Sequence, residues 1–141
     1  MSEFSRIRPS LEKANEIIER HLRFLMRADG GMMANFSGMD LRHLNLSRVD
    51  LTGANLSGAN LSGVDLSHST LNRANLTAAN LNGSCLTSAK AVGTWLAFAD
   101  LRGADIQHFD MTGAFLKQTI FTDEDLPRKI NTHYKVKAIY A

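Results

Sequence analysis

The chain has 141 residues, which suits a single domain with a continuous hydrophobic core. Hydrophobic residues make up 44% of the sequence and charged residues 21%, so wholesale disorder is excluded, and no stretch approaches the roughly 18 consecutive apolar residues of a membrane-spanning helix. The net charge of +2 is the sum of +1 over residues 1–33, −3 over residues 34–125 and +4 over residues 126–141, which indicates a mildly acidic body and a basic tail.

The cysteine content and the first residues favour the cytoplasm. Cys85 is the only cysteine, so an internal disulfide is excluded and a reducing compartment is compatible. The opening residues, MSEFSRIRPS, lead into a charged segment and lack the apolar core of a secretory signal. We therefore predict a cytoplasmic protein, with export by a signal-independent route left open.

Residues 1–33 are predicted to contain an amphipathic helix that acts as a cap. Ser10 is the predicted N-cap, and Gly30–Gly31 the predicted stop. We expect the apolar face to cover the open end of the repeat that follows. Attachment to a membrane surface or self-association is the alternative, which three glutamates on the helix weaken. The apolar residues that recur at helical spacing are Leu11, Ala14, Ile18, Leu22, Leu25 and Met26.

Residues 34–126 follow a five-residue repeat. Every fifth residue from Phe36 to Leu126 is large and apolar at 18 of 19 positions, the exception being Ala91. Two places earlier 9 of 19 residues are alanine, one place earlier 13 of 19 are Asn or Asp, and two places later 8 of 19 are glycine. The central unit reads Ala-Asn-Leu-Ser-Gly, as at residues 54–58. Such a period over some ninety residues indicates a solenoid.

A period of five fits neither the 3.6 of a helix nor the 2.0 of a long strand, but it fits a chain that turns a corner every five residues. The small residue and the leucine of each unit are two apart, so they point to the same side of an extended segment. Asx, serine and glycine at the other places suit a tight turn. One coil would not fold alone, because burying four leucines contributes roughly 6–12 kcal/mol. Ordering the backbone of twenty residues costs about 20–40 kcal/mol, so the coils must stack.

The pattern resembles the pentapeptide-repeat family, whose consensus is close to Ala-(Asp/Asn)-Leu-x-x. The resemblance covers residues 34–126 and implies an all-β solenoid, a right-handed quadrilateral β-helix in which four pentapeptides form one square coil. It implies about four and a half coils here. The chain departs from the consensus in its second half, at Ala91, Trp95, Phe109, Phe115 and Ile120.

Residues 127–141 form a basic C-terminal tail. Pro127 interrupts the repeat, and residues 134–138 (Tyr-Lys-Val-Lys-Ala) alternate with period two, as a half-buried strand does. We expect the tail to pack over the last coil. A basic arm that contacts nucleic acid is the alternative.

The candidate interaction patch consists of Trp95, Phe98 and Phe115. If a coil takes twenty residues, Asn35, Asn55 and Asn75 stack in one column that continues as Trp95 and Phe115, and all three aromatic residues occupy outward positions. Exposed aromatic residues need a cover. Either the tail lies across them, or they form an interface with a partner or a second copy.

Other unusual residues are predicted to serve packing or the surface. Phe109 stands inward where alanine is usual, and its ring is predicted to fill the space left by Ala91, the one missing leucine, in the coil before it. His68 and His108 share a column but lie two coils apart, about 9–10 Å, which is too far to share one metal ion. Cys85 lies between Asp65 and Asp105 with no activating base, so we predict that it is not a nucleophile.

We expect a non-catalytic scaffold for protein–protein interaction, without cofactor or metal, whose partner is another protein or a second copy. No direct contact with nucleic acid is expected, and no membrane association. The first alternative, which the resemblance raises, is a DNA mimic that binds and protects a type II topoisomerase such as gyrase; the body charge of only −3 weakens it. A second alternative is a delivered effector or membrane-associated protein.

Overall fold

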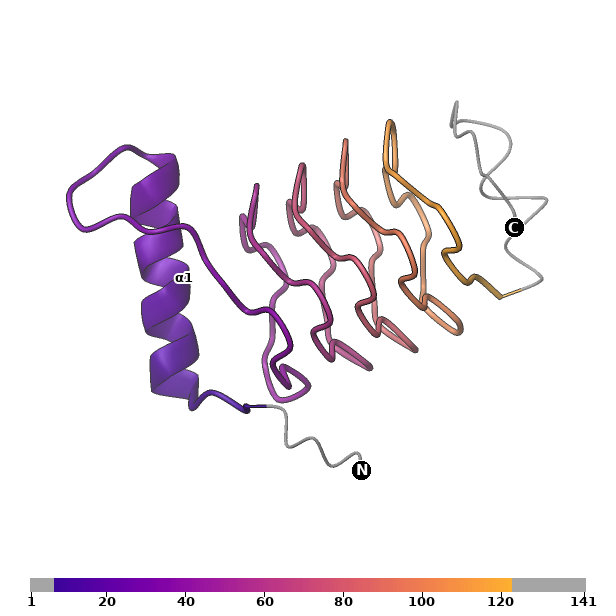
Figure 1. Ribbon diagram of the computed structural model, residues 1–141, viewed down its shortest axis with the longest axis horizontal. Coiled ribbons are helices and arrows are strands. Elements are labelled where there is room, and N and C mark those ends of the chain that lie inside the picture. Colours follow the sequence, from indigo (N-terminus) through magenta and orange to yellow (C-terminus); the bar gives the residue numbers. More distant parts are fainter. Residues whose placement is uncertain (1–6, 123–141) are drawn as a thin grey trace.

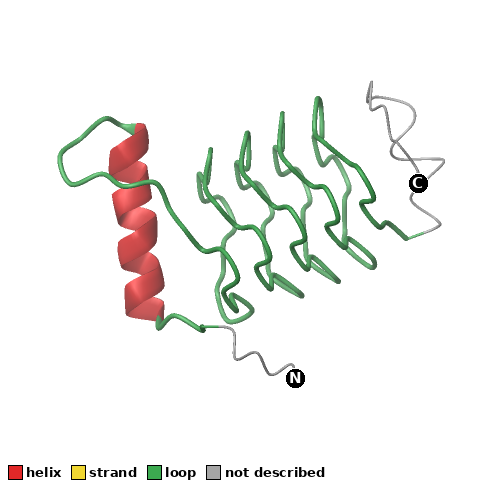
Figure 2. Ribbon diagram, viewed as in Figure 1, coloured by secondary structure: helices red, strands yellow, loops and turns green. Residues whose placement is uncertain are grey.

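The computed structural model describes residues 7–122 (Figure 1), so the last repeat unit and the tail with its predicted strand lie outside the described residues. One helix, α1 (Leu11–Leu25), stands at one end of a stack of coils, and no second helix or strand occurs in this range (Figure 2). The rest of the chain climbs away from α1 coil by coil. The predicted helix and solenoid are therefore both present.

The coils are held in a register of twenty residues. Parallel β-bridges join Asn35 to Asn55, Asn55 to Asn75, and so on along four separate columns as far as the bridge from Asp100 to Ile120. Twenty residues and four bridged positions per coil give the predicted four-sided shape. Each side contributes a single bridged residue between two turns, which is why the predicted β-structure consists of isolated bridges instead of extended strands in the range described.

Every corner from residue 36 to residue 119 is a four-residue turn closed by the carbonyl of the inward fifth-position residue, which is leucine in most units. The N–H of Ala54, for example, donates to the carbonyl of Leu51 at 2.9 Å. The third residue of the turn has positive φ at every corner from Gly38 to Gln118 except at His43, which is the geometry of a type II turn. Glycine adopts this conformation without strain, whereas Ala78 (φ 58°) adopts it at a cost.

Two opposite substitutions test the strain at the corners. Gly63→Ala should lower the free energy of unfolding by about 1 kcal/mol, because a Cβ at φ 69° is strained although no atom lies within 4 Å of it. Ala78→Gly should raise it slightly, by up to about 1 kcal/mol, because the strain is relieved. Urea unfolding of both variants measures the two shifts, and shifts of the same sign would contradict the assignment.

The core is a column of leucines sealed by small residues. The residues at every fifth position from Phe36 to Phe121 are all buried, and those from Phe36 to Leu86 have no exposed surface. Buried hydroxyls in the small-residue positions are paired with backbone carbonyls: Ser69 donates to Leu66 at 2.6 Å, and Thr94 donates to Leu71 at 2.6 Å. No desolvated hydroxyl is left unpaired at these two positions, which keeps the cost of burying it low.

The outward Asn and Asp side chains stabilise the turns that follow them. In each case Oδ1 accepts the backbone N–H two residues later, as Asn55 does from Ser57 at 3.1 Å and Asp65 does from Ser67 at 2.9 Å. Where Lys90 replaces the Asx residue, the N–H of Val92 instead donates to Oδ1 of Asn72, in the coil before it, at 2.9 Å. The Asx columns predicted from the repeat are therefore structural.

Helix α1 begins where predicted but ends earlier. The Oγ of Ser10 accepts the N–H of Lys13 at 3.1 Å, which confirms the N-cap. The predicted stop at Gly30–Gly31 is wrong, because the helix closes with a Schellman motif in which Arg27 takes the left-handed conformation (φ 55°) and the N–H of Ala28 donates to Arg23 at 2.8 Å. Gly31 instead allows close packing, since a Cβ there would lie 2.5 Å from the Phe24 nitrogen.

The face of α1 that meets the coil also differs from the prediction. Ala14 and His21 are buried, and Ile17 and Ile18 pack against the core. The predicted contacts through Leu11, Leu22 and Met26 are wrong, because these side chains are 58%, 38% and 78% exposed. The helix therefore covers the first coil with only one side of its apolar face, and His21 is part of the contact.

The first coil carries larger inward residues than the later ones, and this suits its place beneath α1. Met39, Leu44 and Val49 stand where later coils mostly have alanine or serine, and all three pack in the core. The segment before the helix is also tied to this coil. The carbonyl of Ile7 accepts the N–H of Asp40 at 2.9 Å, and His43 Nε2 lies 2.7 Å from the carbonyl of Pro9. The N-terminal end of the stack is thereby closed.

Candidate interaction face

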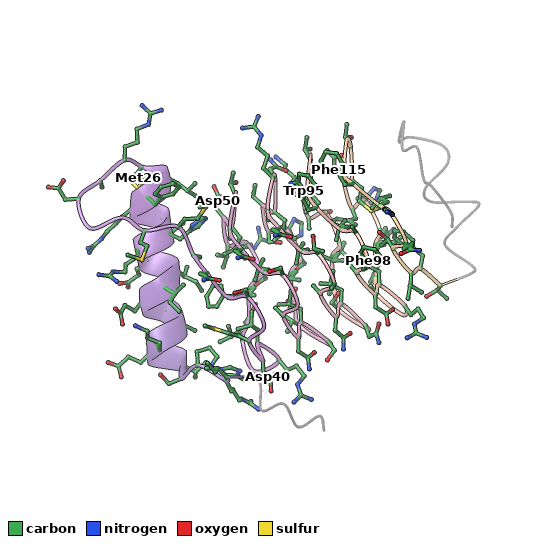
Figure 3. All side chains as sticks on the ribbon, viewed as in Figure 1. Met26, Asp40, Asp50, Trp95, Phe98 and Phe115 are labelled. Carbon is green, nitrogen blue, oxygen red and sulfur yellow. The ribbon has the colours of Figure 1, made fainter. Side chains whose placement is uncertain are left out.

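The predicted aromatic column lies on one face of the coil. Bridges join Asn75 to Trp95 and Trp95 to Phe115, so the column that begins with three asparagines ends with two aromatic rings. The two rings stack, with centroids 4.3 Å apart and planes 20° from parallel. Figure 3 shows Trp95 and Phe115 side by side toward the end of the stack farthest from α1.

The three predicted patch residues are all exposed, but they do not form one cluster. Trp95, Phe98 and Phe115 are 49%, 50% and 49% exposed. Phe98 is the third residue of the corner after Trp95 (φ 61°), and no ring contact joins it to either partner within residues 7–122. Val92 and Ile120 are also exposed, and Ile120 lies in the neighbouring Asp100 column. The prediction of an interface at these residues stays a prediction.

An aromatic residue in this column replaces a side chain that would stabilise the turn. Asn75 accepts the N–H of Thr77 at 3.0 Å, a bond that Trp95 and Phe115 are unable to make. The stacked rings contribute roughly 0.5–1.5 kcal/mol beyond their buried area, which offsets part of that loss. The stability of the coil therefore gives little reason for aromatic residues at these two positions.

Two of the acidic side chains of the solenoid are paired with arginine on another face. Arg42 Nε lies 3.0 Å from Asp40, and Arg102 Nη2 lies 2.7 Å from Asp100. The hydrogen bond from Arg42 is the main reason why the pKa of Asp40 is lowered to about 2. The hydrogen bond from Arg102 likewise lowers the pKa of Asp100. These carboxylates stay ionised and are locally neutralised.

Cys85 lies between Asp65 and Asp105 in one column, as predicted. Bridges join Asp65 to Cys85 and Cys85 to Asp105, and the Cys85 Sγ lies 3.5 Å from the Thr87 hydroxyl. The pKa of Asp65 is lowered mainly by its hydrogen bond from Ser67, with a smaller effect of the nearby His68. Across residues 7–122, no three His, Cys, Asp or Glu side chains lie close enough together to hold a metal ion.

Phe109 and Ala91 are both buried, at 1% and 0% exposure. The N–H of Ala91 donates to the carbonyl of Asp110 at 2.7 Å, so Ala91 lies beside the residue that follows Phe109. This arrangement agrees with the predicted exchange of volume between adjacent coils.

A second apolar surface, which the sequence did not suggest, lies at the α1 end. A pocket of about 150 Å³ opens between the helix and the segment that returns from it. The exposed Met32 and Met33 line it together with Asn35, the first residue of the aromatic column. Its other lining residues, Lys13, Glu16, Ile17 and Arg20, come from α1. Over residues 7–122, no helix is long and apolar enough to cross a lipid bilayer.

Comparison with known protein families identifies the same five-residue repeat that forms the coils. A profile of pentapeptide repeats matches residues 34–67, 59–96 and 99–123, in eight copies. The chain belongs to the pentapeptide-repeat family. No curated protein sequence matches this pentapeptide-repeat chain.

Two cyanobacterial pentapeptide-repeat proteins of solved structure are similar to it. HetL from Nostoc sp. strain PCC 7120, a protein involved in the regulation of heterocyst differentiation, is 31% identical with a TM-score of 0.59. The match covers 62% of this chain and 43% of HetL, so the chain spans less than half of that protein. The protein alr5209 from Nostoc PCC 7120 is 22% identical with a TM-score of 0.63, over 82% of this chain and 98% of alr5209. The second likeness shows the fold.

Proposed function

We propose that this pentapeptide-repeat protein is a non-catalytic scaffold in the cytoplasm whose aromatic column binds another protein. The observation that carries the proposal is the stacked, half-exposed pair of Trp95 and Phe115 at the end of an otherwise polar column. Exposed aromatic residues on a rigid support are the typical anchors of protein interfaces. Family membership supports a right-handed sense for the coil that presents them.

The charge of the solenoid gives no support to the DNA-mimic alternative. Residues 34–122 contain six acidic and six basic side chains, so this part of the coil has no net charge. The net charge of −3 for residues 34–125 is due to Asp123, Glu124 and Asp125, which lie outside the described residues. A protein that imitates a DNA duplex needs a strongly anionic surface.

Substitution of the stacked pair tests the proposal. Protein capture from an extract of the source cell should lose its partner when Trp95→Ala/Phe115→Ala replaces the wild type, with recovery reduced at least about tenfold, because removal of a central aromatic anchor costs roughly 2 kcal/mol or more. His68→Ala/His108→Ala changes two outward residues of another column and serves as the matched control.

Both double variants should remain folded, since the substituted side chains are outside the core, and thermal unfolding checks this. If the aromatic variant and the histidine variant recover the same proteins in the same amounts as the wild type, the aromatic column is not the binding surface.

A further inference from the structure

The face that carries the aromatic pair differs chemically from the other three. We call it the donor face: the column of Asn35, Asn55, Asn75, Trp95 and Phe115, together with the rows of corner residues on either side of it. It is the face on which the proposed function rests, and its chemistry indicates what class of partner it takes.

The asparagines of the donor face present hydrogen-bond donors to the solvent. Oδ1 of Asn35, Asn55 and Asn75 is occupied by the backbone N–H two residues later, at 3.1, 3.1 and 3.0 Å. This fixes the amide orientation and leaves Nδ2 facing outward with no acceptor among residues 7–122. An amide nitrogen offers two donors and an indole N–H one, so Trp95 adds a further donor to the column.

Two basic side chains flank the aromatic pair. Arg73 occupies the corner that precedes Asn75, and its Cγ lies 3.7 Å from the position of a Cβ on Gly93, so its stem runs toward the coil of Trp95. Lys117 follows Phe115 by two residues, and its carbonyl accepts the N–H of Phe98 at 2.9 Å. Arg73 and Lys117 thus occupy corners on opposite sides of the aromatic column.

Among residues 34–122, no acidic side chain lies on the donor face; the acidic residue nearest its helix end is Glu16 of α1, which lines one pocket with Asn35. The bridge pattern places all six aspartates of residues 34–122 on the other three faces. Within residues 34–122, the surface around Trp95 and Phe115 thus combines apolar rings, amide and indole donors and two basic residues at neighbouring corners, with no carboxylate to repel an anion. These aspartates are Asp40, Asp50, Asp65, Asp100, Asp105 and Asp110.

We propose that the donor face docks an extended segment of a partner protein in which acidic residues flank apolar ones. The apolar side chains pack against the Trp95–Phe115 stack, while the carboxylates pair with Arg73, with Lys117 and with the free amide donors. Such charge complementarity selects the partner and speeds its association, and the aromatic contact supplies most of the affinity.

The fluorescence of Trp95 tests the charge of the face directly, because this is the only tryptophan in the chain. Relative to its quenching of free tryptophan amide, iodide should quench the emission of the full-length protein more strongly than caesium does, since the local potential attracts anions. The preference should shrink at high salt and disappear in Arg73→Glu/Lys117→Glu. Arg48→Glu is the matched control: Arg48 takes the same corner position as Arg73 (φ 62° and 59°) but lies on another edge of the coil.

Binding is then measured with synthetic peptides of defined composition. A peptide in which glutamates flank leucine and phenylalanine should shift the Trp95 emission to the blue in a saturable manner. A peptide with lysine in place of each glutamate should not. Arg73→Glu/Lys117→Glu should weaken binding of the glutamate peptide about tenfold or more, whereas Arg48→Glu should leave it unchanged.

Several outcomes overturn the proposal, and they separate it from the proposed function. Equal binding of both peptides, or of neither, together with equal quenching by iodide and caesium, rejects the acidic partner while the capture experiment still decides the scaffold function. A blue shift that depends on protein concentration alone, matched by a dimer in light scattering, assigns the face to a second copy. Emission that is already shielded at all dilutions shows that the chain covers the face itself, which rejects both proposals.

Discussion

Phe109→Ala should lower the free energy of unfolding by roughly 3–5 kcal/mol, the range found for phenylalanine in well-packed cores. The side chain is 1% exposed and stands in a column of small residues, so its removal leaves a cavity that a backbone fixed by bridges on both sides does not fill. Equilibrium unfolding in urea measures the loss. A change below about 1 kcal/mol would show that the ring does not fill the space left by Ala91.

A substitution at Ala91 tests whether Phe109 fills the space that a leucine at position 91 would occupy, or is merely buried. Ala91→Leu alone restores the usual leucine of the repeat but should destabilise by about 1–3 kcal/mol, because Phe109 already occupies the space. In the double variant Phe109→Ala/Ala91→Leu the leucine enters the cavity, so the combined loss should be smaller than the sum by about 0.5–3 kcal/mol. If the losses of the two single variants add up to the loss of the double variant, the two residues do not share a cavity.

The coil could be predicted from the sequence because the five-residue period requires a turn after each unit, and the resemblance to the pentapeptide-repeat family implies four units per coil. A leucine at every fifth position buries itself only if the chain turns after each unit, and twenty residues per coil then place Asn75, Trp95 and Phe115 in one column. The prediction of the column holds even where the consensus fails, since the backbone bridges continue through Trp95 and Phe115. Irregular side chains in the second half leave the register unchanged.

The helix was predicted less well, because its two ends and its buried face depend on hydrogen bonds that apolar spacing does not reveal. Arg27 takes the left-handed conformation expected of a glycine, and His21 is buried where an apolar residue was expected. The donor character of the interaction face was equally hidden. It depends on which amide atom of Asn55 or Asn75 the turn occupies, and on the direction in which the stem of Arg73 runs.

His21 joins α1 to the first coil through a bond that only its unprotonated Nδ1 can make. The N–H of Ala34 donates to that nitrogen at 3.0 Å, at the point where the chain enters the solenoid. The side chain has no exposed surface, and among residues 7–122 Nε2 makes no well-formed hydrogen bond, although the backbone of Thr52 lies near the ring. Burial lowers the pKa of His21, although the carboxylate of Asp50 and the backbone of Thr52 oppose the shift. Asp50 lies toward the helix end of the coil (Figure 3).

A histidine whose pKa is lower in the folded state than its ordinary value of 6.5 makes a contribution to stability that is complete above pH 6.5. Below that pH the unfolded chain binds a proton that the folded chain resists, so the free energy of unfolding should fall. The slope has a limit of about 1.4 kcal/mol per pH unit for one group. Urea unfolding from about pH 7 down to about pH 5 should show this decrease in the wild type.

His21→Gln should remove the decrease, because the glutamine oxygen accepts the Ala34 N–H and does not titrate in this range. His68→Gln, at an exposed corner, should leave it in place and serves as the matched control. Loss of the Asp40 contribution falls in a separate window, since that pKa is lowered from 3.8 to about 2 and its stabilisation disappears only as the pH falls through those values. An undiminished decrease between pH 6.5 and about pH 5 in His21→Gln would show that protonation elsewhere, and not at the junction of the cap and the first coil, destabilises the fold.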